Sequence, residues 1–178
     1  MADPHHVPVL DGFDRLTVTL YRTGLIVASS AVIATGIASP LAPHLVVWTE
    51  GVLVGGVLLA VLNMHLYDKR IRYALAALGI SGAFLWGIGG FWVGSVGIGL
   101  TLAAVSGYAL KEQFCFRVPG LRLVPVMLAG SVLTRVLGIP IATAVLMSIA
   151  GVLLVVLCVA KLRMPLHFDV GDKSKYQI

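Results

Sequence analysis

Long stretches without a charged residue dominate this chain and limit what it can fold into. Uncharged runs cover residues 23–49, 51–67, 73–110 and 136–160. A helix needs about 20 mostly apolar residues to cross roughly 30 Å of hydrocarbon, so the run at 73–110 is long enough to cross twice. Hydrophobic residues make up 58% of the chain and charged residues 12%, whereas soluble domains contain about 45–50% and about 25%. The sequence therefore predicts an all-α membrane protein.

The positions of the charges divide the apolar sequence into six predicted crossings. We expect helices at residues 23–39, 46–66, 73–89, 91–110, 121–137 and 141–162. The fifth has the weakest signal, because its uncharged stretch at 123–134 is short enough for a re-entrant or interfacial segment. The distribution of Lys and Arg favours a full crossing.

With six crossings, the N-terminus, the loops at 68–72 and 111–122 and the C-terminal tail share one side of the membrane. That side holds all of the 13 Lys and Arg residues except Arg135. Cytoplasmic loops carry an excess of these residues. We therefore expect a six-transmembrane-helix bundle with both termini cytoplasmic, in which 1–22 is a cytoplasmic segment, 23–162 the transmembrane domain and 163–178 a cytoplasmic tail.

Small residues spaced four apart indicate how the predicted helices pack, since membrane helices associate where their backbones can approach closely. Ser95, Gly99, Ala103 and Gly107 share one face of the fourth helix. Similar stripes in the second helix, at 51 and 55, and in the third predict a bundle centred on these three helices. A dimer interface is the alternative.

Glu50 and Arg135 are the only acidic and basic residues expected at the outer surface. Each lies near the outer end of a predicted helix, and isolated buried charges are costly. We expect the two to form an ion pair there, with a gate or a proton relay as the alternative.

The stretch that follows the fourth helix combines basic and aromatic residues, which suits the headgroup layer or a partner's cytoplasmic face. We interpret it as a cytoplasmic docking loop. Its residues are Lys111, Glu112, Phe114, Cys115, Phe116 and Arg117.

His65, Cys115 and Cys158 belong to the same cytoplasmic layer and are weak candidates for a cofactor or metal site. The two cysteines show no metal-binding spacing, and free Cys is commonly a small buried hydrophobe. We therefore expect no cofactor and predict no catalytic residue.

Three segments resemble a known family: FDRLTVTLYRTGL at 13–25, HLYDKRIR at 65–72 and ALKEQFCFR at 109–117. They are similar to domain-of-unknown-function family 2301, small bacterial integral membrane proteins that are frequent in cyanobacteria. The resemblance implies a multi-helix protein of the bacterial inner membrane, with the thylakoid membrane as the alternative, and carries over no reaction or ligand.

The near absence of polar residues inside the predicted helices favours a non-enzymatic accessory or assembly component of a membrane complex. One alternative is a redox or metal-handling protein that uses His65, Cys115 and Cys158, and a weaker one is a small-solute transporter. The expected partners are the lipid bilayer and other membrane proteins. The net charge of +5 is explained by topology, so we expect no nucleic-acid binding.

Reporter fusions test the predicted topology. Fusions after residues 44, 70, 90, 116, 138 and 178 should lie alternately outside and inside, starting outside, because the basic loops stay in the cytoplasm. An outward C-terminal fusion would contradict six crossings.

Overall fold

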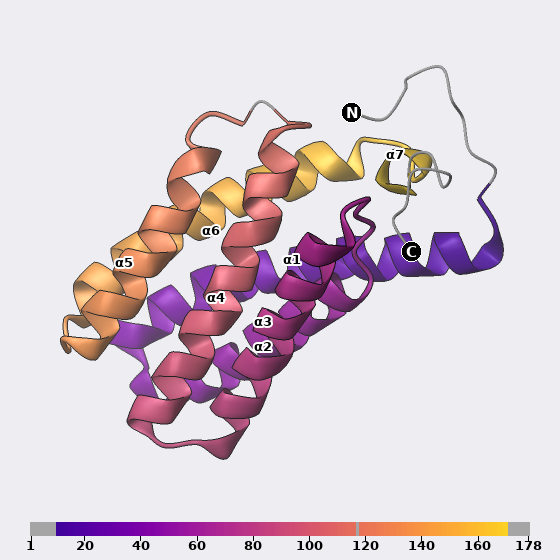
Figure 1. The fold of residues 1–178 in the computed structure, drawn as a ribbon. Coiled ribbons are helices and arrows are strands. Elements are labelled where there is room, and N and C mark those ends of the chain that lie inside the picture. The colour runs from indigo at the N-terminus through magenta and orange to yellow at the C-terminus, as the bar shows by residue number, and fades with distance from the viewer. Residues whose placement is uncertain (1–9, 117, 171–178) are drawn as a thin grey trace.

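A computed structural model describes residues 10–116 and 118–170 of the chain, and these residues form helices joined by short connections. Five of the helices are long and apolar enough to cross a membrane. Figure 1 shows them as an elongated bundle with the long helix α1 along one side. In chain order, the helices of four or more residues are α1 (Gly12–Leu41), α2 (Val46–Leu62), α3 (Lys69–Ile88), α4 (Phe91–Gln113), α5 (Val124–Val136), α6 (Pro140–Leu162) and α7 (His167–Val170).

Two helices begin earlier than expected because side chains cap their first turns. The helix predicted to begin at residue 23 begins at Gly12, where the Asp11 carboxylate accepts from the Asp14 amide at 2.8 Å and the Asp14 carboxylate accepts from the Asp11 amide at 3.1 Å. The third helix begins at Lys69 because Asp68 accepts from the Arg70 amide at 2.8 Å. Such caps satisfy orphan N–H groups at a helix start. The charges at 14, 15 and 22 therefore lie within α1.

The connection between α3 and α4 is short, as the predicted helices at 73–89 and 91–110 imply, and it forms a tight hairpin. Only Gly89 and Gly90 separate the two helices, and their φ angles are +83° and +79°. Side chains with a Cβ rarely adopt such angles, so this turn depends on glycine.

Helix α5 differs from the other large helices in length. It has 13 residues, which corresponds to about 20 Å of helix, and the short 3-10 turn η2 (Leu121–Leu123) precedes it. It packs against α4 and α6. Helix α5 is not one of the five candidate spans. The crossing predicted at residues 121–137 therefore stays a prediction.

The closest helix packing involves α1 and not only the three helices with the predicted stripes. Helix α1 packs against α2 and α6, while α3 packs against α4. A Cβ placed on Gly24 would lie 2.5 Å from the Ala60 amide nitrogen, and one on Gly56 would lie 2.7 Å from the Ala28 amide nitrogen. Gly24 and Ala28 of α1 thus face Gly56 and Ala60 of α2, as in membrane pairs with small residues four apart.

The expected stripe on α2 is confirmed at Gly51 and not at Gly55. A Cβ on Gly51 would lie 3.1 Å from the Trp86 ring of α3, whereas one on Gly55 would meet no atom within 4 Å. The neighbouring Gly56 makes the backbone contact, because the second helix turns that side toward α1.

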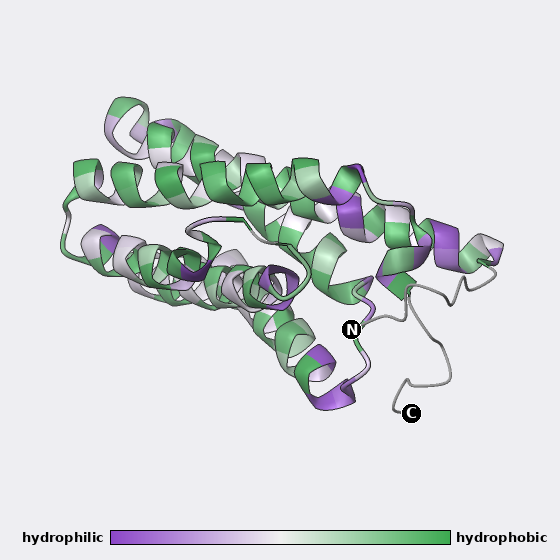
Figure 2. Ribbon diagram, turned by 90° about the horizontal axis from the view of Figure 1, so that it is seen from above, coloured by the Kyte–Doolittle hydropathy of each residue, from purple (hydrophilic) through white to green (hydrophobic). Residues whose placement is uncertain are grey.

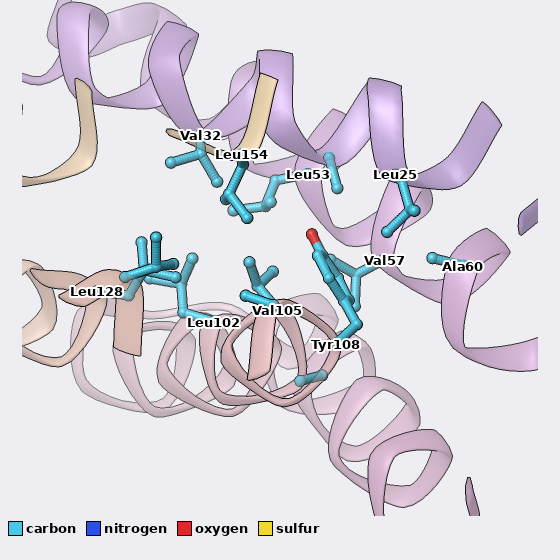
Figure 3. Packing of buried hydrophobic residues seen from close by; sticks show 14 of the residues in the cluster. Leu25, Val32, Leu53, Val57, Ala60, Leu102, Val105, Tyr108, Leu128 and Leu154 are labelled. Atoms are coloured by element: carbon cyan, nitrogen blue, oxygen red, sulfur yellow. The ribbon is translucent and has the colours of Figure 1, made fainter. Parts of the chain in front are cut away.

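Apolar side chains of the six large helices meet in the core. Figure 3 shows Leu25 and Val32 of α1 and Leu53 of α2 facing Leu102 of α4 and Leu128 of α5, with Leu154 of α6 beside Val32. In Figure 2 the helices are mostly green along their lengths, and purple residues gather mainly near helix ends. The apolar middle of the bundle and its polar ends are those of a protein that lies in lipid.

The adjacent glycines Gly55 and Gly56 test the α1–α2 contact. Gly56→Ala should lower the midpoint of thermal unfolding in detergent, because its methyl group overlaps the α1 backbone and forces the helices apart. Gly55→Ala, the control, should leave the midpoint unchanged or raise it, since Ala favours helix by about 1 kcal/mol over Gly. Equal effects of the two substitutions would contradict this contact.

Candidate functional site

Charged side chains from four helices meet at one end of the bundle. This end contains the start of α1, the α2–α3 and α4–α5 connections and the end of α6. We call it the basic end. The group that we call the charge cluster consists of Tyr21 and Arg22 of α1, Lys111 and Glu112 of α4, Lys161 of α6 and Asp169 of α7.

Glu112 is the centre of the charge cluster. Its side chain is 1% exposed, and its carboxylate accepts three hydrogen bonds. The Tyr21 hydroxyl donates at 2.6 Å, the Lys111 ammonium at 3.1 Å and the Lys161 ammonium at 3.0 Å. A buried carboxylate is tolerated when it is paired and hydrogen-bonded in this way. Glu112 thereby connects α1, α4 and α6.

Asp169 extends the cluster to the short helix α7. It forms ion pairs with Lys161 and with Arg22, whose Nη2 lies 2.6 Å from Asp169 Oδ2. The same guanidinium donates to the main-chain carbonyls of Met164 at 2.8 Å and Pro165 at 3.1 Å. Arg22 therefore holds the chain that follows α6 against α1.

The aromatic ring of Tyr21 lies close to both lysines of the cluster. The Lys111 and Lys161 ammonium groups lie 4.9 Å and 5.2 Å from its centroid, within the range of cation–π attraction. Tyr21 thus contributes a hydroxyl to the carboxylate and a ring face to the cations.

The charge cluster forms part of the wall of a cavity of about 190 Å³ at the basic end. The remaining wall includes the predicted residues His65 and Cys115, together with apolar side chains from several elements. These apolar side chains are Leu66, Phe116, Met164, Phe168 and Val170.

His65 lies in the connection between α2 and α3, with its Nε2 3.4 Å from the Thr17 hydroxyl. The pKa of His65 is lowered from its ordinary value, first by burial and then by the positive charge of Lys111, while Asp14 and Asp169 oppose this shift. A lowered pKa keeps the imidazole neutral at pH 7, where it can donate one hydrogen bond and accept another.

The three weak cofactor candidates do not come together. His65 and the exposed Cys115 both line the cavity, whereas Cys158 is buried in the core with its sulfur 3.4 Å from the Ser29 hydroxyl. Within residues 10–116 and 118–170, no three His, Cys, Asp or Glu side chains are placed so as to hold a metal ion.

The residues of the predicted docking loop have different environments. Glu112 is buried in the charge cluster and Phe116 packs on the core, while Lys111 is partly buried. Phe114 is 74% exposed and Cys115 is exposed. Arg117 lies outside the described residues. Among the described residues of this loop, the exposed ones are therefore Phe114 and Cys115.

At the opposite end of the bundle, the structure brings Glu50 and Arg135 together as an ion pair. The Trp86 indole nitrogen donates to Glu50 Oε2 at 3.1 Å, and Arg135 Nε donates to the Ser95 hydroxyl at 3.3 Å. The pair thus connects α2, α3, α4 and α5. The sequence did not single out Trp86 and assigned Ser95 only to a packing stripe, because neither residue signals its polar partner.

Four members of the charge cluster were also missed as site residues. Arg22 was placed in a cytoplasmic segment, and Lys161 was counted only for topology. One signal was available, since the predicted helices place Tyr21, Lys111, Lys161 and Asp169 near the same membrane surface. Nothing in the sequence says which of them share a partner.

The helical fold, the apolar middle and the polar ends define a multi-pass integral membrane protein. The model of a family described as "Uncharacterized integral membrane protein (DUF2301)" matches residues 91–178. A Haemophilus influenzae protein with the name "Uncharacterized protein" is 38% identical over 185 residues, which cover 100% of both chains. The chain therefore belongs to this family of uncharacterised integral membrane proteins, as the sequence resemblance predicted. No solved structure matches it.

A double-mutant cycle tests the ion pair at the opposite end. Glu50→Gln and Arg135→Gln should each lower the free energy of unfolding in detergent by about 1–3 kcal/mol, because each leaves one charge of a largely buried ion pair without its partner. The double substitution should cost less than the sum of the two. Arg122→Gln, at an exposed arginine, is the control for loss of a guanidinium. Strictly additive losses would mean that the two charges do not interact.

Proposed function

We propose that the protein is a non-enzymatic accessory or assembly component of a membrane complex. The observation that carries the proposal is the separation of the polar groups of the described residues into two ends, with few polar side chains between them. Of the buried hydroxyls between the ends, those of Ser29, Thr101 and Ser131 donate to a carbonyl of their own helix at 2.6 Å, 3.0 Å and 2.7 Å, whereas those of Thr35 and Tyr108 have no hydrogen-bond partner among the described residues. Ser or Thr side chains that bond within their helix leave few groups to guide a polar solute.

The same arrangement favours this role over the two alternatives. A redox or metal role for His65, Cys115 and Cys158 needs all three side chains at one place, and Cys158 lies in the core beside Ser29. A transporter of polar solutes needs polar groups near the middle of the membrane. In the described part of the chain, the carboxylates and cations that could serve lie in the two end clusters.

We further propose six crossings, with both termini on the cytoplasmic side of a bacterial inner membrane. The contact between Arg135 and Glu50 supports this topology, because it places the end of α5 beside the start of α2. Helix α5 begins near the basic end, so it reaches from one end of the bundle to the other despite its length of 13 residues. The bilayer can thin locally around such a short span.

The exposed part of the docking loop is the surface that we assign to the partner in the complex. Phe114 and Cys115 lie just beyond the last turn of α4, outside the apolar middle of the bundle. An aromatic ring that is exposed at the level of the headgroups or beyond suits contact with another membrane protein.

Native gel electrophoresis of membranes that contain the tagged protein tests this role. The wild-type chain should migrate with a larger complex, and Phe114→Ala should shift it toward the free protein, because a large exposed ring contributes strongly to an interface. Phe84→Ala is the matched control, since Phe84 of α3 is 69% exposed and lies one turn from the end of α3 at the opposite end of the bundle.

Cross-linking provides a second readout on the same membranes. A thiol-directed photocross-linker should react at the exposed Cys115 and spare the buried Cys158, so the cross-linked product reports on this loop alone. Migration as a free protein in native membranes, with no cross-linked product, would refute the accessory role. A bound chromophore or metal in the purified protein would favour the redox alternative.

A further inference from the structure

The cavity at the basic end carries more positive than negative charge. Three cations in its wall, Arg22, Lys111 and Lys161, face two carboxylates, Glu112 and Asp169, so these five residues leave a net charge of +1. Arg22 and Lys161 are almost fully buried and are paired with the two carboxylates, whereas the side chain of Lys111, the third cation, is 21% exposed. An anion in the cavity would neutralise the excess positive charge at a place that is largely shielded from water.

Hydrogen-bond donors also exceed acceptors in the cluster. A lysine ammonium has three N–H donors and a carboxylate has only acceptors. The acceptors of Lys111 are Glu112 Oε1 at 3.1 Å and the Tyr21 hydroxyl at 3.5 Å, and those of Lys161 are the two carboxylates. Each ammonium therefore keeps one N–H beyond these bonds. The Glu112 carboxylate, in contrast, already accepts three.

The rest of the cavity wall is largely apolar and partly aromatic. Phe116 follows α4 and Phe168 belongs to α7. Leu66 lies in the α2–α3 connection, and Met164 lies between α6 and α7. The cavity volume of about 190 Å³ is many times what one water needs. A charged wall and an apolar wall that face one space suit a ligand with an anionic head and a hydrocarbon part.

The position of the cavity points to the same class of ligand. It lies where α1, α4 and α6 reach the basic end of the bundle, which is the level of the lipid headgroups if these helices cross the membrane. Cationic pockets between membrane helices at the cytoplasmic side commonly hold anionic headgroups.

From these observations, we infer that this cavity binds an anionic amphiphile through a phosphate or carboxylate group held by Lys111, Lys161 and Arg22, with its first carbons against Phe116 and Phe168. The anionic group has two sources, a membrane lipid or a soluble metabolite that carries the same group. This inference does not depend on the accessory role, which concerns the exposed side of the loop.

Lys111 is the residue to change. Its side chain is 21% exposed and contacts one carboxylate, whereas Lys161 contacts both and holds three helices together. Lys111→Gln removes the charge and leaves the Glu112–Lys161 ion pair in place. Arg70→Gln is the matched control, because Arg70 is an exposed cation at the same end and does not line the cavity.

Binding is measured on the full chain in a neutral detergent, with phosphatidylglycerol, phosphatidylcholine and inorganic phosphate as separate probes. Native mass spectrometry gives the lipid affinities, and calorimetry gives the phosphate affinity. We expect phosphatidylglycerol to bind more tightly than phosphatidylcholine. Lys111→Gln should weaken phosphatidylglycerol binding about tenfold or more, as expected for loss of a charged hydrogen bond, and Arg70→Gln should not.

A chemical block keeps the test valid if Lys111→Gln fails to fold. A bulky thiol reagent on the exposed Cys115 of the wild-type chain places a group at the cavity wall, and the buried Cys158 should not react. The labelled protein should lose the same affinity. Competition by inorganic phosphate would assign the site to a soluble anion, and its absence to a lipid. Equal affinity for the two lipids with no phosphate binding, or equal effects of Lys111→Gln and Arg70→Gln, would overturn the proposal.

Discussion

Neutralisation of Lys161 by two carboxylates is the interaction on which the arrangement at the basic end depends. Lys161 ends α6, Glu112 ends α4, and Asp169 lies in α7 after a short turn. A single buried charge at this depth would cost several kcal/mol, so the three residues have to meet. Because Glu112 also accepts from Tyr21, and Asp169 from Arg22, helix α1 is drawn into the same group.

Close backbone contacts complement these charges along the rest of the bundle. Lipid removes most of the hydrophobic advantage of helix association, so the helices depend on packing at small residues. Gly24 and Gly56 let α1 and α2 approach until no methyl group would fit, and Gly82 and Gly97 have the same role for α3 and α4. Charge pairing at both ends and glycine contacts between them together explain how mostly apolar helices hold one arrangement.

The two ends of the bundle differ in ways that bear on function. The opposite end contains one neutral pair, Glu50 with Arg135, with Trp86 and Ser95 as hydrogen-bond partners. Both ends have a cavity, but the wall of the one at the basic end contains more cations than carboxylates, whereas Glu50 and Arg135 balance each other at the opposite end. The first arrangement is electrically neutral and links four helices. The second has a net positive charge in its cavity wall, which suits an anionic ligand.

The sequence alone determined where the apolar helices lie, because the uncharged runs and the glycine turn at Gly89 are local signals. It also pointed to Glu50 and Arg135, since they are the only opposite charges expected at one surface. Only the tertiary structure decided that Gly56 and not Gly55 faces α1, because helix rotation is set by all the neighbours at once. It likewise decided the pairing of Arg22 with Asp169, 147 residues apart, since partners so distant in the chain are chosen by packing and not by local pattern.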